Sequence, residues 1–548
     1  MRSFLPGRSR YFLSTFLLLA GCGDCGAGNT TEDGGNNSGG SGSGNGNAGG
    51  STGEFMTGGG SEGGGAPVGG DPKTCEQAKN AKTYLGCEFW PTVTANNVWS
   101  IFDFAVVVAN AGDQPAEVTV DRNGGSVTTA TVAPNSTATL YLPWIPELKG
   151  PDADACGSAT PLNASVRSTG GAYHLTSSIP VTVYQFNALE YGPQGGPPGK
   201  DWSSCPAAGC FLDCFSYSND ASLLLPTPAL TGNYRVIGYH GWQLANIGST
   251  VSVTGTEDST NVTVTLGPQG NLIAGGGVNA ASAGQTVTFP LQRGEVVQLY
   301  GSPTGDFSGS LVQADKPVQV VHGLPCMNIP DEYGACDHIE ESVLPAETLG
   351  KHYFVTAPSH ANGGPAPYVV RIYGNVDGTT LTYSAGAPGN APVTINAGQV
   401  VDMGMVSQNF EVTGDHEFAV ALFQVGAEAT GSTLGDPAQS IATAVEQYRS
   451  KYVFLAPFDY DVNYVDIVMP LSAQVTLDGS PITASPEPIS SDFGIARVTL
   501  ADTGNGAHVL TSTLPVGIQV SGYGQYTSFQ YPGGLNLELI APPPPPPE

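Results

Sequence analysis

The sequence predicts an all-β protein: tandem antiparallel β-sandwich-like repeats, in four units of about 100 residues, after a disordered Gly/Ser/Asn-rich linker. Three observations support this prediction. Apolar runs with alternating Val, Ile and Thr recur through the body of the chain, and the same phrases return in the same order. Charged residues make up only 12% of the chain, whereas Gly occurs 75 times. Low charge with abundant Gly, Thr and Val is typical of extracellular all-β proteins.

The phrase that organises the chain is an apolar run entered through a polar residue and, in three of four copies, a proline. Because Pro cannot donate to a sheet ladder, it is confined to strand starts, edges and bulges. We therefore expect Pro180, Pro317 and Pro515 each to open a strand, and the third copy has Glu417 in that place. The copies are His174–Phe186, Leu311–His322, Phe410–Gln424 and His508–Val520.

A second phrase precedes the first in each unit and consists of two Val/Ile/Thr runs around a polar turn such as Asp377-Gly378. This pattern predicts a tight antiparallel hairpin. A third phrase, built around a tyrosine, opens three of the units. The expected hairpins are Val106–Val118, Val251–Val262, Val370–Leu381 and Val465–Val475, and the tyrosine phrases are Asn233–Val236, Lys351–Val355 and Lys451–Phe454.

The N-terminus has the charge order of a secretory signal, with Arg residues before an apolar run, residues 11–20, that is too short to span a bilayer. The run ends in Leu19-Ala20-Gly21-Cys22, which resembles the lipobox of bacterial lipoproteins. That resemblance implies a signal peptide at residues 1–21 and a lipid on Cys22. A plain signal peptide with an incidental Cys is the alternative.

The expected organisation follows from shifts in composition. Residues 22–70 carry the lipidated N-terminus and a Gly/Ser/Asn tether with almost nothing apolar, so they cannot offset the entropy of ordering. We expect β repeat 1 with a Cys-rich loop at 71–213, β repeat 2 at 214–335, β repeat 3 at 336–435, β repeat 4 at 436–540 and a Pro-rich tail at 541–548.

The body has an even number of cysteines, which in an exported chain indicates up to four disulfides. Neighbour pairing suggests Cys75 with Cys87 and Cys326 with Cys336, and the other four residues supply two further bonds of open connectivity. The candidates are Cys75, Cys87, Cys156, Cys205, Cys210, Cys214, Cys326 and Cys336.

Two segments of the sequence partly match metal-binding patterns. Residues 322–326 and 336–341 hold two His and two Cys, but their spacing matches no common zinc pattern. Residues 459–463 begin like a calcium loop, yet Tyr464 and Pro470 stand where Gly and Glu are required. We expect a disulfide in the first segment, solvated carboxylates in the second, and no metal or cofactor.

From residue 71 on, the sequence contains no nucleophile elbow, phosphate loop, redox pair or zincin motif, so we expect no enzyme. Trp202 and Trp242 lie in expected loops and are candidate binding residues, with core anchoring as the alternative. The formal net charge of -29 argues against nucleic acid as a partner.

The stretch Cys336–Val355, with Cys-Asp-His, acidic residues, a Pro and then a Gly before an aromatic strand, resembles the IgGFc-binding protein N-terminal domain family. Lys316-Pro317 and the turn at residues 377–380 are also similar to that family. The likeness covers roughly Phe215 to Gln525. It implies an extracellular binding module without catalytic residues to transfer.

Together these features predict a surface-exposed lipoprotein of the bacterial cell envelope, on the outer membrane. Its partners would be the membrane, through the N-terminal lipid, and an extracellular protein or glycan ligand. A structural envelope scaffold and a glycan-processing hydrolase are the alternatives.

Overall fold

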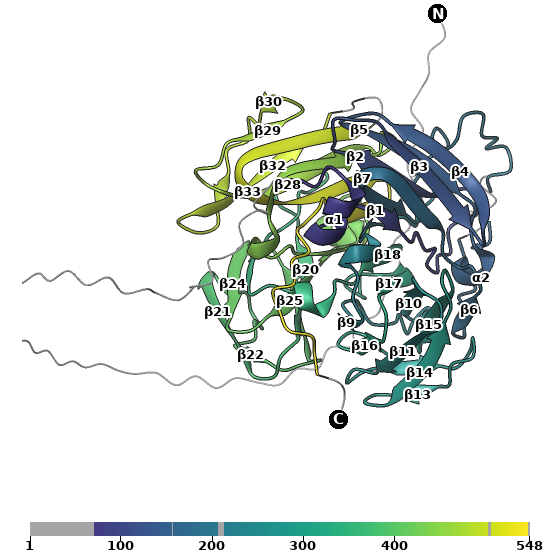
Figure 1. Cartoon of the computed structure of the whole chain (residues 1–548). Coiled ribbons are helices and arrows are strands. Elements are labelled where there is room, and N and C mark those ends of the chain that lie inside the picture. The colour runs from purple at the N-terminus through teal and green to yellow at the C-terminus, as the bar shows by residue number, and fades with distance from the viewer. Residues whose placement is uncertain (1–70, 156, 207–212, 502, 504–505, 546–548) are drawn as a thin grey trace, which may run out of the picture. The chain divides into compact units, whose positions relative to one another are not determined.

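The computed structural model describes residues 71–545, apart from 156, 207–212, 502 and 504–505. The expected signal peptide, lipidated Cys22 and linker lie outside the described residues. The described chain is built from antiparallel sheets, which confirms the all-β prediction (Figure 1). The helices are short, and no helix of the described part is long and apolar enough to cross a membrane. They are α1 (Cys75–Ala81), α2 (Pro146–Lys149), α3 (Ala427–Thr430) and the 3-10 turns η1 (Thr227–Ala229), η2 (Ala346–Thr348) and η3 (Val445–Gln447).

The strands fall into four units in chain order. The first unit contains β1 (Gly86–Phe89), β2 (Phe104–Asn110), β3 (Ala116–Arg122), β4 (Gly125–Val132), β5 (Ser136–Leu142), β6 (Val166–Ser168), β7 (His174–Phe186) and β8 (Ala221–Leu224). The second contains β9 (Asn233–Arg235), β10 (Thr250–Gly255), β11 (Thr260–Thr265), β12 (Asn271–Ile273), β13 (Ala281–Ser282), β14 (Thr286–Leu291), β15 (Val296–Gly301), β16 (Leu311–Ala314), β17 (Val318–Met327) and β18 (Asp337–Ser342).

The third unit contains β19 (His352–Val355), β20 (Tyr368–Gly374), β21 (Thr379–Ala385), β22 (Thr394–Ile395), β23 (Val400–Val406), β24 (Phe410–Gly414), β25 (Phe418–Gln424) and β26 (Ala438–Ile441). The fourth contains β27 (Arg449–Leu455), β28 (Val462–Pro470), β29 (Val475–Leu477), β30 (Ser480–Pro481), β31 (Glu487–Pro488), β32 (Phe493–Thr499), β33 (Ala507–Gly524) and β34 (Thr527–Pro532).

Each unit has an inner ladder of strands, which includes its last strand, and an outer ladder. In the second unit the inner order is β13-β12-β15-β10-β17-β18, with β6 from the first unit paired to β15, and the outer order is β14-β11-β16-β9. The third unit repeats this scheme with β23-β20-β25-β26 inside and β19-β24-β21-β22 outside. In the first and fourth units a single long strand, β7 or β33, belongs to both ladders.

The expected hairpins are wrong, because the two strands of each phrase lie in different ladders. In the second unit β10 pairs with β15 and β17, whereas β11 pairs with β14 and β16. The polar turn thus carries the chain from the inner to the outer ladder. A turn within a hairpin and a turn between two ladders use the same residues, but the flanking strands differ in burial. β10 is buried throughout, whereas β11 alternates between buried and exposed positions.

The proline phrase marks the return crossing from the outer to the inner ladder. Pro317 lies between β16 and β17, as Glu417 does between β24 and β25. Pro180 and Pro515 do not open strands as expected; they lie inside β7 and β33, between residues that pair in the outer ladder and residues that pair in the inner one. A residue at such a corner has no ladder partner, so the missing N–H of Pro costs nothing there.

A buried tyrosine hydroxyl ties the first strand of a unit to this crossing. Tyr234 donates to the carbonyl of Val318 at 2.6 Å, and Tyr353 donates to that of Phe418 at 2.6 Å. Tyr452 makes the same bond to the residue after Pro515. This contact explains why the tyrosine phrase recurs.

The four units close on one another through their last strands. β8 contacts β18 and β34, and β26 contacts the same two strands. Figure 1 shows the fourth unit, near β33, beside the first, near β5. The pairing also shifts the expected boundaries. β8, β18 and β26 lie near the starts of the expected repeats 2, 3 and 4, but they pair with β7, β17 and β25 of the first, second and third units.

One carboxyl group lies where these last strands meet. Asp220, which precedes β8, accepts backbone N–H groups from Glu340 of β18 at 3.0 Å and Gln439 of β26 at 2.9 Å. Its other oxygen accepts from Gln530 of β34 at 3.2 Å and from Ala221 at 2.9 Å. Burial raises the pKa of Asp220 well above its usual value, and these N–H groups oppose that shift.

We expect Asp220→Asn to lower the free energy of unfolding by about 2 kcal/mol or more, because an amide nitrogen cannot accept from N–H donors and each orphaned buried donor costs about 1 to 3 kcal/mol. Urea unfolding monitored by circular dichroism measures the change. The exposed Asp492→Asn is the control and should stay within about 0.5 kcal/mol of wild type. Equal stabilities for the two variants would contradict a central role for Asp220.

Candidate functional site

A pocket of about 320 Å³ lies between the first and second units. Most of its lining comes from loops, which is where binding residues are concentrated on rigid β scaffolds. The lining residues are Asn97, Val98, Trp99, Ala153, Gly157, Ala159, Ser216, Tyr217, Ser218, Trp242, Ala245, Ile247, Cys326 and Cys336.

The aromatic walls are held by local backbone contacts. Trp99 donates through Nε1 to the carbonyls of Ala153 at 3.1 Å and Asp154 at 3.2 Å, which fixes its ring. Trp242 sits at the base of a tight loop, because its N–H and carbonyl both bond to Ile247, at 2.7 and 3.1 Å. Leu244 at the tip of that loop is 86% exposed, which is unusual for leucine and places an apolar side chain beside the pocket.

Aromatic and small side chains dominate the lining of the pocket. Its described lining contains no Asp, Glu, His, Lys or Arg. Two buried donors, Trp242 Nε1 and Asn97 Nδ2, have no hydrogen-bond partner among the residues that the structure describes. A buried N–H without a partner is costly, so these groups suit a ligand that supplies acceptors while its apolar face packs on the rings.

The two tryptophans predicted as candidate binding residues therefore lie in different surroundings. Trp242 lines the pocket, whereas Trp202 packs against Phe102 at a centroid distance of 5.1 Å, with Lys200 Nζ 4.2 Å from its ring centre. Sequence reasoning missed Trp99 and Tyr217 as pocket residues. The aromatic residues of the loop before β8 were the available signal for Tyr217.

The body cysteines form the disulfides Cys75–Cys87, Cys205–Cys214 and Cys326–Cys336. Cys156 and Cys210 lie outside the described residues. The Cys326–Cys336 bond forms one wall of the pocket, and it uses both thiols of the segment weighed as a zinc site.

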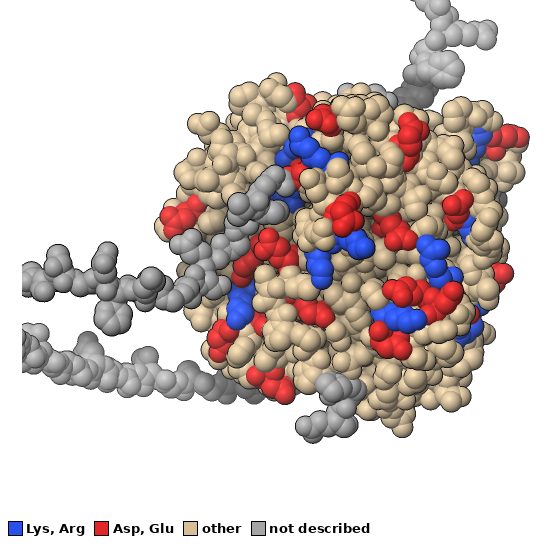
Figure 2. Space-filling model, viewed as in Figure 1, with Lys and Arg blue, Asp and Glu red and all other residues tan. Residues whose placement is uncertain are grey.

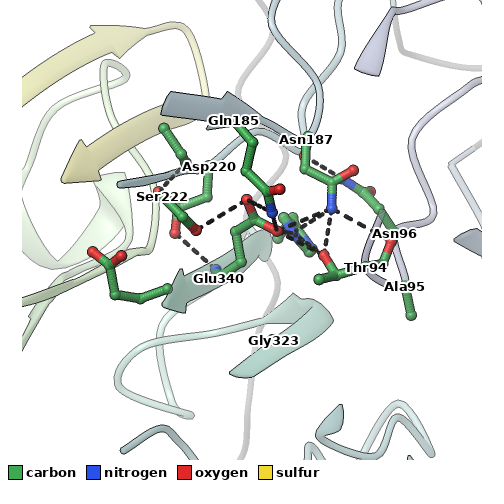
Figure 3. Close-up of polar contacts among 12 residues, drawn as sticks. Thr94, Ala95, Asn96, Gln185, Asn187, Asp220, Ser222, Gly323 and Glu340 are labelled. Carbon is green, nitrogen blue, oxygen red and sulfur yellow. Dashed lines mark hydrogen bonds and ion pairs between the residues drawn. The ribbon is translucent and has the colours of Figure 1, made fainter. Parts of the chain in front are cut away.

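Glu340 of that segment belongs to a buried polar network (Figure 3). Glu340 is fully buried and accepts from the side chains of Thr94, Gln185, Asn187 and Ser222, at 2.8 to 3.4 Å. These donors come from the first unit, so the network joins the first unit to β18. With its oxygens bonded and no exposure to solvent, Glu340 has a structural role.

A second pocket, of about 180 Å³, contains the carboxyl groups of Glu190 and Asp459. Asp459 is not a solvated strand end as expected: it accepts from the N–H of Tyr191 at 2.8 Å, and burial raises its pKa to about 6. Glu190 accepts from the N–H of Asp103 at 2.7 Å and pairs with Lys200 at 3.3 Å. These carboxyl groups tie loops together.

Charged side chains are sparse on the molecular surface. On the face in Figure 2, small groups of acidic and basic residues are separated by broad uncharged areas. This distribution differs from the basic stripe that nucleic-acid binding requires.

The raised pKa of Glu190 predicts that the free energy of unfolding depends on pH. Burial raises its pKa to about 8, with Asp103 acting in the same direction, whereas an unfolded Glu titrates near about 4.3. The folded protein thus keeps a proton that the unfolded chain loses, so the free energy of unfolding falls as the pH rises from about 4 to about 8.

Between pH 5 and pH 8, wild type should therefore lose at least about 1 kcal/mol more stability than Glu190→Gln, in urea unfolding at each pH. The Gln side chain keeps an oxygen for the Asp103 N–H and removes the titration. Parallel pH profiles for the two proteins would show that Glu190 does not titrate in this range.

A comparison with known proteins identifies the family of this chain. A family model described as IgGFc binding protein matches residues 220–522, more than half of the chain. The human protein named IgGFc-binding protein is 27% identical over 328 residues, which is 59% of this chain. The match covers 6% of the human protein's length. The matched region contains Asp220, Trp242, the Cys326–Cys336 disulfide and Glu340, and the chain belongs to the IgGFc binding protein family.

Proposed function

We propose that the protein is a lipid-anchored binding protein on the surface of a bacterial cell envelope. A lipid on Cys22 holds it to the outer membrane, residues 22–70 act as a tether, and the pocket at Trp242 takes an extracellular protein or glycan ligand. The observation that carries the binding role is a pocket with aromatic walls, unpartnered donors and no Asp, Glu, His, Lys or Arg in its described lining.

The pocket favours a small, partly apolar group of a larger ligand. At about 320 Å³ it is near the lower end of small-molecule sites, so it fits one side chain or one sugar ring. Stacking on Trp99 or Trp242 would hold the apolar face. A carbonyl or hydroxyl oxygen would accept from Trp242 Nε1 and Asn97 Nδ2.

The family supports an extracellular binding role in general. The human relative is named for binding of IgG Fc, and the stretch shared with this chain is a small part of it. Several pocket residues, among them Asn97, Trp99 and Tyr217, precede the region that the family model matches. We therefore assign the ligand by the chemistry of the pocket and include Fc among the probes.

The binding role predicts a difference between two tryptophan variants. Wild-type protein passed over columns of mucin, polysaccharide and immunoglobulin Fc should be retained on at least one of them. Trp242→Ala should weaken that retention at least about tenfold, because truncating a buried aromatic anchor costs about 2 kcal/mol or more. Trp202→Ala is the matched control and should retain the ligand, since its ring lies outside the pocket.

Retention on none of the columns would favour the structural scaffold, and cleavage of the polysaccharide would favour the hydrolase. Equal losses for Trp242→Ala and Trp202→Ala would remove the pocket from the binding mechanism.

The proposed lipid anchor predicts that replacing Cys22 changes where the protein is found in the cell. In fractionated cells, wild-type protein should be found with the outer membrane and be removed by protease added to whole cells. Cys22→Ala should release it from the membrane, because no acyl chain can then attach. Unchanged membrane association of Cys22→Ala, or protection of the wild type from added protease, would contradict the anchored, exposed arrangement.

A further inference from the structure

The second pocket, of about 180 Å³, lies between the first and fourth units and is lined largely by apolar side chains. Leu189 comes from the loop after β7, and Leu455 and Pro457 come from the end of β27 and the loop that follows it. Phe458 is 57% exposed although it lines the pocket, so its ring stands where the pocket meets solvent. These walls can pack against a hydrocarbon chain that enters from solvent.

The ionisable groups around the second pocket carry an excess of negative charge. Glu190 and Asp459 line the pocket, and Glu190 accepts the N–H of Asp103 at 2.7 Å. Lys200 Nζ pairs with Asp103 at 2.5 Å and with Glu190 at 3.3 Å. Among the described residues, no ion pair includes Asp459. Even when Glu190 is protonated, the charges of Asp103 and Asp459 exceed that of Lys200.

One oxygen of Asp459 is available to a ligand. The N–H groups of Tyr191 and Gly192 both reach Oδ2, at 2.8 and 3.4 Å. No donor from another described residue bonds to Oδ1, and this oxygen is not fully enclosed by protein atoms. Burial raises the pKa of Asp459 to about 6, so at neutral pH the carboxyl group is charged and has one oxygen free.

The hydroxyl group of Tyr141 faces the same charges from β5. Burial and the charges of Glu190, Asp103 and Asp459 all raise the pKa of Tyr141. The hydroxyl group therefore stays protonated, and its oxygen can accept a hydrogen bond from a cation. The face of the Tyr141 ring also attracts positive charge.

The arrangement favours an ammonium group over other cations. In the described residues no three His, Cys, Asp or Glu side chains are placed to share a metal ion. A guanidinium group binds best through two parallel bonds to both oxygens of one carboxylate, but Oδ2 of Asp459 is already bonded. An ammonium group has three diverging donors and can bond to Oδ1 alone.

We propose that the second pocket binds a lysine side chain of a partner protein, with its ammonium group on Asp459 Oδ1 and the Tyr141 hydroxyl. The methylene groups of the lysine pack on Leu455, Pro457 and Phe458, as such stems do on apolar surfaces. An amino sugar would instead place ring hydroxyl groups against these walls. The net charge of -29 attracts a basic partner to the protein. This site shares no lining residue with the Trp242 pocket and does not rest on the proposed function.

The test titrates the full chain with Cys22→Ala by isothermal calorimetry at pH 7. The probe is Nα-acetyl-lysine N-methylamide, and we expect one saturable site. Nα-acetyl-norleucine N-methylamide has a similar stem without the charge and should bind at least about tenfold more weakly, because a hydrogen bond to a charged group is lost. Glucosamine should also bind more weakly than the lysine probe.

Two variants locate the site. Asp459→Asn should weaken binding of the lysine probe at least about tenfold. Asp461→Asn is the matched control: it removes the same charge two residues away, is exposed and does not line the pocket, so its affinity should stay within about twofold of wild type. Phe458→Ala, at an exposed position, should remain folded and weaken binding about threefold or more.

The pH dependence in wild type supplies a readout that needs no variant at Asp459. From pH 7 to pH 5 the affinity for the lysine probe should fall about tenfold, because Asp459 takes up a proton near pH 6 and its charge is lost. Of the groups that face the site, Glu190 keeps most of its proton in this range and Asp103 is paired with Lys200.

Equal affinities for the lysine and norleucine probes, or an affinity that does not change from pH 7 to pH 5, would overturn the proposal. Equal affinities of Asp459→Asn and Asp461→Asn would do the same, and tighter binding of glucosamine would refute the assignment to lysine. Loss of retention on the ligand columns in Trp242→Ala concerns only the other pocket, so the two proposals fail separately.

Discussion

The carboxyl group of Asp220 is the contact on which the assembly of the four units depends. It accepts backbone N–H groups from the last strands of the second, third and fourth units, and it precedes the last strand of the first. A buried N–H needs a partner, and at this junction the ladders end before they can supply one. A single side chain with two acceptor oxygens therefore replaces several ladder bonds and fixes where the four strands meet.

The polar interior follows from this closure. When the inner ladders turn toward one another, their inward faces are buried on both sides, and side chains that would be solvated in an isolated sandwich must find partners. Glu340 does so through Thr94, Gln185 and Asn187 of the first unit. Such a network favours one relative placement of the units, because any other would leave the buried carboxyl group of Glu340 without donors.

The candidate site is a product of the same closure. Trp99 and Tyr217 come from the first unit, and Trp242 and the Cys326–Cys336 disulfide come from the second. Neither unit alone would form the pocket. Since the family match begins at residue 220, part of the pocket lies in a region that the family model does not describe.

The sequence by itself determined the all-β class, the recurrence of the phrases and the family, because strand periodicity, proline and glycine act locally. It did not determine that each apparent hairpin joins two ladders, although the continuous burial of β10 beside the alternation of β11 was legible as a pattern. Only the tertiary structure decided that Trp242 faces a pocket while Trp202 packs on Phe102, and that Asp220 and Asp436 are buried. Those outcomes depend on which distant segments meet, and the cost of burying a polar group is set by partners that lie far away along the chain.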